Sequence, residues 1–153
     1  MTTLSPSLSA QASERTSAHG EAPASVGAAT GVPALILRLE AAAVLALALA
    51  AYARAGQGWL VFAALFLVPD LSMLGYLGGR RLGAIAYNIG HSYLVPVALG
   101  ATGLMIGQPF LVSIALIWIA HIGFDRLLGY GLKYQTAFGH THLSAKGGSK
   151  AAA

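Results

Sequence analysis

The chain has 153 residues, of which 56% are hydrophobic and only 9% are charged, whereas about a quarter of the residues in a soluble domain carry charge. This balance excludes an ordinary water-soluble fold. The net charge of +4 comes from few residues, and no base-reading motif accompanies it, so nucleic-acid binding is excluded too. Cysteine is absent, which rules out disulfides and thiolate metal ligands.

The first segment, residues 1–32, is rich in Ser, Thr, Ala, Gly and Pro and lacks the apolar residues that a packed core needs, which predicts a disordered tail. A transmembrane domain over residues 33–143 follows, and residues 144–153 form a flexible C-terminal tail. The domain holds apolar stretches of about 20 residues or more, the length that spans a bilayer. These stretches are residues 33–53, 59–78, 83–105 and 109–132.

Short loops at 54–58, 79–82 and 106–108 join the predicted spans, so consecutive helices are expected to run antiparallel as neighbours. The predicted fold is therefore all-α, a polytopic membrane protein whose four transmembrane helices form an up-down antiparallel bundle.

Basic residues are distributed unequally between the two sides of this bundle. The side with both termini carries Arg15, Arg38, Arg80, Arg81, Lys133, Lys146 and Lys150, and the opposite side carries only Arg54. Positively charged residues accumulate on the cytoplasmic side of membrane proteins. The sequence therefore predicts a multi-pass protein of the inner membrane with both termini in the cytoplasm.

A few polar residues within the spans all fall at similar depth, near the side that carries the termini. They are Glu40 in the first span, Asp70 in the second, Asn88 and His91 in the third, and His121 and Asp125 in the fourth. Ionisable groups are costly inside a bilayer, and they usually face the bundle interior and mark a site or a pathway. All four helices are thus expected to contribute to one polar layer.

The spacing of these residues indicates metal binding. Asn88 and His91 are three residues apart and His121 and Asp125 are four apart, so each pair shares a helix face. We expect His91, His121 and Asp125 to bind a metal, with Asp70 or Glu40 as a further ligand or as a general base. Asn88 and Arg126 would support the site. Imidazole and carboxylate ligands without thiolate suit zinc, iron or manganese.

Three functional interpretations remain open at this stage. The sharpest is a metal-dependent hydrolase that acts on a lipid or another amphiphile. The second is a small transporter or proton-handling component, and the third is a structural membrane protein in which the polar layer only holds helices together. Membrane lipids are the expected partners, and a homo-oligomer is compatible with a bundle of four short helices. A haem bound by His91 and His121 is disfavoured because carboxylates crowd both residues.

Two further features concern the borders of this layer. Pro69 and Pro96 each remove a helix hydrogen bond, so the second and third helices are expected to kink. The segment FGHTHL at 138–143 follows the fourth span. His140 and His142 within it would be solvated, or the segment would fold back and cap the polar layer.

Several strings resemble the bacterial membrane protein family called domain of unknown function 4260. They are PDLSMLGYLGG at 69–79, YNIGHSYLVP at 87–96, WIAHIGFDRLLGYGLKY at 118–134 and THL at 141–143. The resemblance covers about residues 37–143. It implies a four-span protein of the bacterial inner membrane, and it supports Glu40, Asp70, Asn88, His91, His121, Asp125 and Arg126 as motif positions. The family supplies no activity.

Overall fold

The computed structural model describes residues 27–55, 57–135, 139 and 141–143. Helices dominate this part of the chain, and the extended pairing found in it is an isolated bridge between Lys133 and Thr141. Four helical segments are long and apolar enough to cross a membrane, namely Gly31–Arg54, Trp59–Gly78, Arg80–Met105 and Pro109–Leu128. The prediction of an all-α protein with four membrane spans is therefore confirmed. Most of the first predicted tail, up to residue 26, and the whole of the second lie outside the described residues.

The first and last spans are continuous helices, α2 (Gly31–Arg54) and α6 (Pro109–Leu128). Pro109 opens α6 at a position where its missing N–H costs nothing and its fixed φ suits a helix. Gly129 closes α6 in the left-handed conformation, with φ of 92°, which a residue without Cβ adopts readily. The fourth span thus ends at Leu128 and not at residue 132 as predicted.

The two middle spans are interrupted. The second consists of α3 (Trp59–Phe66) followed by η1 (Val68–Gly78), a 3₁₀ helix that begins next to Pro69. The third consists of α4 (Arg80–Gly90) and α5 (Leu94–Met105), separated by residues 91–93. Pro96 lies in the first turn of α5, where no helical hydrogen bond to its nitrogen is needed. The expected kinks are therefore complete breaks in helix geometry.

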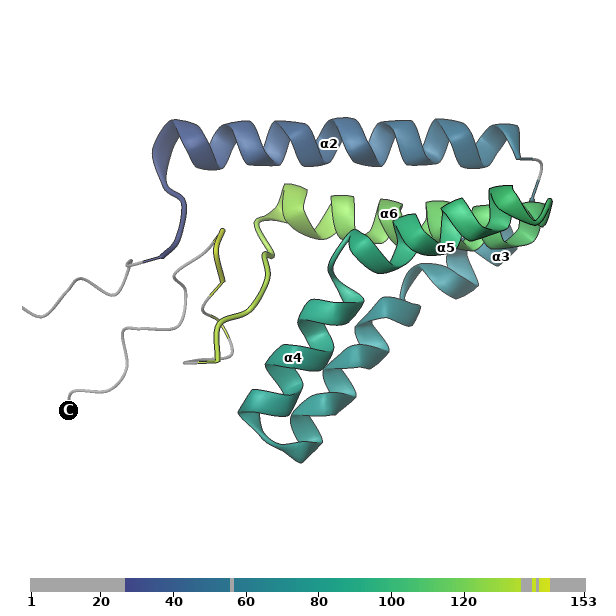
Figure 1. Ribbon diagram of the computed structural model, residues 1–153. Helices are drawn as coiled ribbons and strands as arrows, with labels where there is room; N and C mark the ends of the chain where they lie inside the picture. Colours follow the sequence, from purple (N-terminus) through teal and green to yellow (C-terminus); the bar gives the residue numbers. More distant parts are fainter. Residues whose placement is uncertain (1–26, 56, 136–138, 140, 144–153) are drawn as a thin grey trace, which may run out of the picture.

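The two kinds of span are arranged differently (Figure 1). Helix α6 packs against α2, α5 and α3, while η1 and α4 pair with each other and leave this group at an angle. Close packing requires glycine in both places. A Cβ on Gly123 would lie 3.2 Å from the backbone oxygen of Ala41 in α2, and a Cβ on Gly83 in α4 would overlap the Tyr76 ring of η1. The up-down order of the spans is kept, but the η1–α4 hairpin diverges from the bundle.

The described part of the chain after α6 continues from the end of this helix (Figure 1). We call this the basic end, because Arg126 is in the last turn of α6, Arg38 lies against Gly129, and Lys133 follows shortly after. Asn88 of α4 holds this segment through two hydrogen bonds: its Nδ2 donates to the oxygen of Lys133 at 2.9 Å, and its Oδ1 accepts from the nitrogen of Lys133 at 2.7 Å. His142 returns to the same segment, because its backbone nitrogen donates to the oxygen of Leu132 at 3.2 Å.

Candidate metal centre

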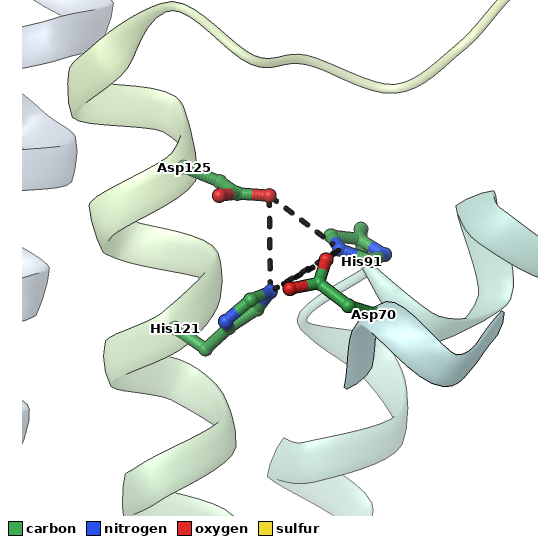
Figure 2. Close-up of side chains that lie close together, drawn as sticks. All are labelled: Asp70, His91, His121 and Asp125. Atoms are coloured by element: carbon green, nitrogen blue, oxygen red, sulfur yellow. Dashed lines mark hydrogen bonds and ion pairs between the residues drawn. The ribbon is translucent and has the colours of Figure 1, made fainter. Parts of the chain in front are cut away.

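Four side chains from three spans meet at one point between α6 and the breaks in the middle spans (Figure 2). Asp70 comes from the first turn of η1, His91 from the residue that ends α4, and His121 and Asp125 from the face of α6 that points toward them. We call Asp70, His91, His121 and Asp125 the centre. The ligand atoms of all four residues lie within 4.8 Å of one another.

The distances from the two imidazole nitrogens of the centre are close to those of a metal site. The two Nε2 atoms of His91 and His121 are 3.2 Å apart. His91 Nε2 lies 3.4 Å from Asp70 Oδ1 and 3.4 Å from Asp125 Oδ2, and the corresponding distances from His121 Nε2 are 3.6 and 3.8 Å. Ligand atoms about 2.1 Å from a tetrahedral metal lie about 3.4 Å from one another. The centre therefore has room for one such ion without a large rearrangement.

His91 is oriented as a metal ligand would be. Its Nδ1 lies 3.0 Å from the backbone oxygen of Tyr87, which only accepts, so Nδ1 carries the proton and a neutral ring directs the lone pair of Nε2 into the centre. The Tyr87 ring stacks on the imidazole with centroids 3.8 Å apart. The Tyr87 hydroxyl also donates a long hydrogen bond of 3.5 Å to Asp125 Oδ2. Tyr87 thus positions two of the four candidate ligands.

His121 is the most enclosed residue of the centre, with 2% of its side chain exposed. The edge of its ring packs against Phe66 of α3, with centroids 5.2 Å apart. Its Nδ1 is buried and has no hydrogen-bond partner among the described residues. The polar environment of this ring is therefore the group of atoms around Nε2, which faces the centre.

The two carboxylates of the centre differ in how much of each side chain is exposed. The side chain of Asp125 is 17% exposed, and that of Asp70 is 41% exposed. Asp70 therefore occupies the open side of the centre, whereas His91, His121 and Asp125 form its enclosed side. This difference allows three fixed ligands and one accessible carboxylate.

The predicted supporting residue Asn88 does not reach the centre, because it binds the backbone of Lys133 instead. The prediction assumed that Asn88 and His91 share the face of a continuous helix. Helix α4 ends at Gly90, but the nitrogen of His91 still donates to the oxygen of Tyr87 at 2.8 Å and the two rings stack. The His91 side chain therefore lies on the side of Tyr87 and not on that of Asn88. Arg126 does lie beside the centre, where its Nη2 donates to the backbone oxygen of His91 at 3.4 Å.

Glu40 is exposed on α2 and is not a member of the group that brings the four ligand atoms together. It lines a separate cavity of about 140 Å³ together with Tyr93, Arg126 and His142. The expectation that all four helices contribute to one layer is therefore wrong for α2.

His142 has a backbone role. Its Nδ1 accepts a hydrogen bond of 2.9 Å from the nitrogen of Leu132. Burial and the nearby charge of Arg126 lower the pKa of His142, which favours the neutral ring that this bond requires. The Thr141–Leu143 part of FGHTHL packs at the basic end, with Leu143 buried, and His140 lies outside the described residues.

Two residues near the centre are missing from the predicted set of site residues. The sequence does contain a signal for Tyr87, since it precedes His91 by four residues and stacks on it as residues one helical turn apart do. Lys133 has no such signal, because it is beyond the last span. Its ammonium lies 4.3 Å from the centroid of the Tyr87 ring. Burial lowers the pKa of Lys133, against the opposing effect of Asp125 and Asp70.

The donor set of two imidazoles and two carboxylates fits a divalent metal of the zinc, iron or manganese type. An ion-free arrangement is also chemically sound, with a proton on His121 Nε2 shared with His91 Nε2. In that state hydrogen bonds among the polar side chains of the centre would hold the spans together. The geometry therefore defines two states that measurement of bound metal separates.

These observations define a small four-span membrane protein with a buried histidine–carboxylate centre. The chain belongs to the family described as domain of unknown function (DUF4260), which it matches over residues 34–145. Searches of curated proteins and of solved structures found no match.

Proposed function

We propose that this protein is a membrane-embedded, metal-dependent hydrolase that acts on an amphiphile. The observation that carries the proposal is the asymmetry of the centre. His91, His121 and Asp125 are enclosed, and the half-exposed Asp70 lies beside them. Catalytic zinc sites commonly use three protein ligands and leave a fourth position for water or substrate.

In this scheme His91, His121 and Asp125 hold the metal, and Asp70 is the general base. Glu40, the other carboxylate considered for that role, belongs to a different cavity. Tyr87 keeps the lone pair of His91 Nε2 directed inward through its backbone oxygen. A divalent ion held here would supply Lewis acidity, which polarises a carbonyl or phosphoryl oxygen and makes water a better nucleophile.

The residues of this chain account for the proton movements of an ester hydrolysis. The Asp70 carboxylate takes a proton from water as the water oxygen bonds to the ester carbonyl carbon. When the bond between that carbon and the leaving oxygen breaks, Asp70 returns the proton to the leaving oxygen. The products are a carboxylic acid and an alcohol, and Asp70 regains its starting charge.

We propose that the basic end faces the cytoplasm of a bacterial inner membrane and that the centre is therefore reached from that side. The bias of basic residues toward that end supports the proposal. Reporter fusions at Ala153 and at Gly56 should give opposite results. A reporter at Ala153 that is active only on the outer side would reverse the orientation. Membrane lipids are the proposed partners, in a monomer or a homo-oligomer.

Elemental analysis tests the metal part of the proposal. Protein purified in detergent without chelator should retain about one equivalent of a transition metal. Retention should fall in His121→Ala and Asp125→Ala and should persist in the matched control His142→Ala. It should also fall on acidification, since protons compete with the metal for imidazole and carboxylate ligands. Wild-type protein that neither retains metal nor binds added zinc, iron or manganese would leave the centre as a packing or proton-handling feature.

A further inference from the structure

A second cavity lies in the angle between the η1–α4 hairpin and helices α3 and α6. Its volume is about 330 Å³. The residues that line it include Leu65, Pro69, Ser72, Gly90, Ile114 and Trp118. This volume is at the lower end of the range of small-molecule sites, which suits one narrow chain.

The cavity adjoins the centre on three elements. Pro69 and Gly90 line it, and the residues that follow them are Asp70 and His91. Trp118 lines it about one turn before His121 on α6, and its indole Nε1 donates to the backbone oxygen of Gly90 at 2.6 Å. The wall of the cavity is therefore fixed to the same breaks that position the centre.

Nearly all of this wall is hydrocarbon, and none of its described residues is charged. Two wall residues, Val68 and Ile89, are exposed by 47% and 57% on the surface of the spans. In a bilayer this surface meets lipid tails, because the spans that carry it have the length and hydropathy of transmembrane helices. A hydrocarbon chain can thus enter without crossing water.

One side chain in the wall offers an unused polar group. The Ser72 hydroxyl is buried and has no hydrogen-bond partner among the described residues. It lies next to Gly90, because a Cβ placed there would be 2.8 Å from Ser72 Oγ. A buried hydroxyl without a partner costs free energy, and an uncharged acceptor on a ligand would satisfy it.

We infer that this cavity binds the hydrocarbon chain of a single-chain carboxylic ester and that Ser72 donates a hydrogen bond to the ester end. The inference rests on the proposed hydrolase function and identifies its substrate class. The hydrocarbon chain lies between η1, α4 and α6, and the ester group lies toward Asp70 and His91, the residues that follow Pro69 and Gly90 of the wall. The wall residues select against charged chains.

Trp118 provides a direct reporter. The chain has two tryptophans, so Trp59→Phe leaves Trp118 as the remaining one. We would titrate this variant in detergent with the glycerol monoester of dibromostearic acid, whose bromine atoms quench indole fluorescence. Quenching should saturate. In Leu65→Phe, which fills the cavity, the apparent affinity should fall by roughly fivefold or more. The matched control Leu60→Phe changes a residue of α3 that is 84% exposed and should leave the affinity unchanged.

Ser72→Ala tests the contribution of the ester group separately from that of the hydrocarbon chain. It should weaken binding of the brominated ester and leave binding of a brominated alkane unchanged. Quenching that rises in proportion to the probe, equally in all variants, would show bulk detergent or lipid contact and would overturn the inference. Folding of each variant is checked by its elution as one species in gel filtration, and a variant that fails is replaced by Ile114→Phe.

Metal content measured on the same samples separates this inference from the proposed function. In one outcome the protein binds no metal and still shows saturable quenching that Leu65→Phe blocks. That result would support the site for the hydrocarbon chain and would contradict the hydrolase function. Bound metal, combined with quenching that rises in proportion to the probe, would support the metal centre and would contradict the site for the hydrocarbon chain.

Discussion

Helices α2 and α6 differ in regularity from the η1–α4 hairpin. The former are uninterrupted and pack closely through small residues such as Gly123. The latter borders two helix breaks, one at Leu67 and one at residues 91–93. The centre lies where the two regions meet. Continuous helices provide the support, and the breaks turn Asp70 and His91 toward α6.

This difference has a physical basis. A side chain on an uninterrupted helix keeps the direction that the helical period gives it, whereas a residue at a helix end has its own backbone angles. Broken spans are tolerated in membranes where other groups satisfy the freed backbone atoms. Here Trp118 and Arg126 donate to the oxygens of Gly90 and His91. The break at residues 91–93 is therefore held in place by α6 itself.

The largest effect is expected from a substitution that forces the two helices of the hairpin, η1 and α4, apart. In Gly83→Val the new side chain would overlap the Tyr76 ring, so α4 and η1 must move apart at a cost of about 2 kcal/mol or more. We expect a lower melting temperature and loss of bound metal. The matched control Gly58→Val adds its Cβ in open space and should be near neutral. Retention of metal by folded Gly83→Val would contradict the dependence of the centre on the hairpin.

Removal of the two hydrogen bonds between Asn88 and the backbone of Lys133 should have the next largest effect. Asn88→Ala removes two hydrogen bonds to Lys133 and should destabilise the protein by about 1–3 kcal/mol, measured by thermal unfolding in detergent. Ser92→Ala, which removes a single exposed bond to the nitrogen of Leu94, serves as the control. Equal stability of the two variants would show that the segment after α6 adds nothing to the hairpin.

A smaller effect is expected from Tyr87→Phe. This change removes the hydroxyl that donates to Asp125 Oδ2 but keeps the ring against His91 and the backbone oxygen that orients it. Loss of a group that supports a metal ligand lowers metal affinity by about tenfold or more, and the length of this bond favours the lower value. Competition with a chelator measures the change. Tyr130→Phe, at a residue that is 59% exposed, should have no effect.

The smallest effect is expected on the stability of the metal-free protein. Asp70→Asn and His91→Ala should leave the melting temperature after chelator treatment nearly unchanged or raised, because functional polar groups are kept at a cost in stability. A polar cluster that serves only to join helices would behave differently. Marked unfolding of both variants would favour that structural role.

The sequence predicts the four spans well because the length and hydropathy of a span are local properties of consecutive residues and need no knowledge of tertiary contacts. It also identifies His121 and Asp125 as a pair, since α6 is continuous and residues four apart in it share a helix face. The same reasoning fails for Asn88, because His91 at the end of α4 aligns with Tyr87 while Asn88 bonds the backbone of Lys133. Depth in the membrane likewise placed Glu40 in the layer, but depth does not specify which face of α2 a residue occupies.

The central claim is that His91, His121 and Asp125, with Asp70 beside them, hold a metal ion. X-ray absorption spectroscopy of the zinc-loaded, detergent-purified protein tests it most directly. The account predicts two imidazole nitrogens and carboxylate or water oxygens at about 2.0–2.2 Å, with one imidazole lost in His121→Ala and none in His142→Ala. A zinc spectrum that is unchanged by His121→Ala, or that loses its imidazole signal in His142→Ala, would contradict the account.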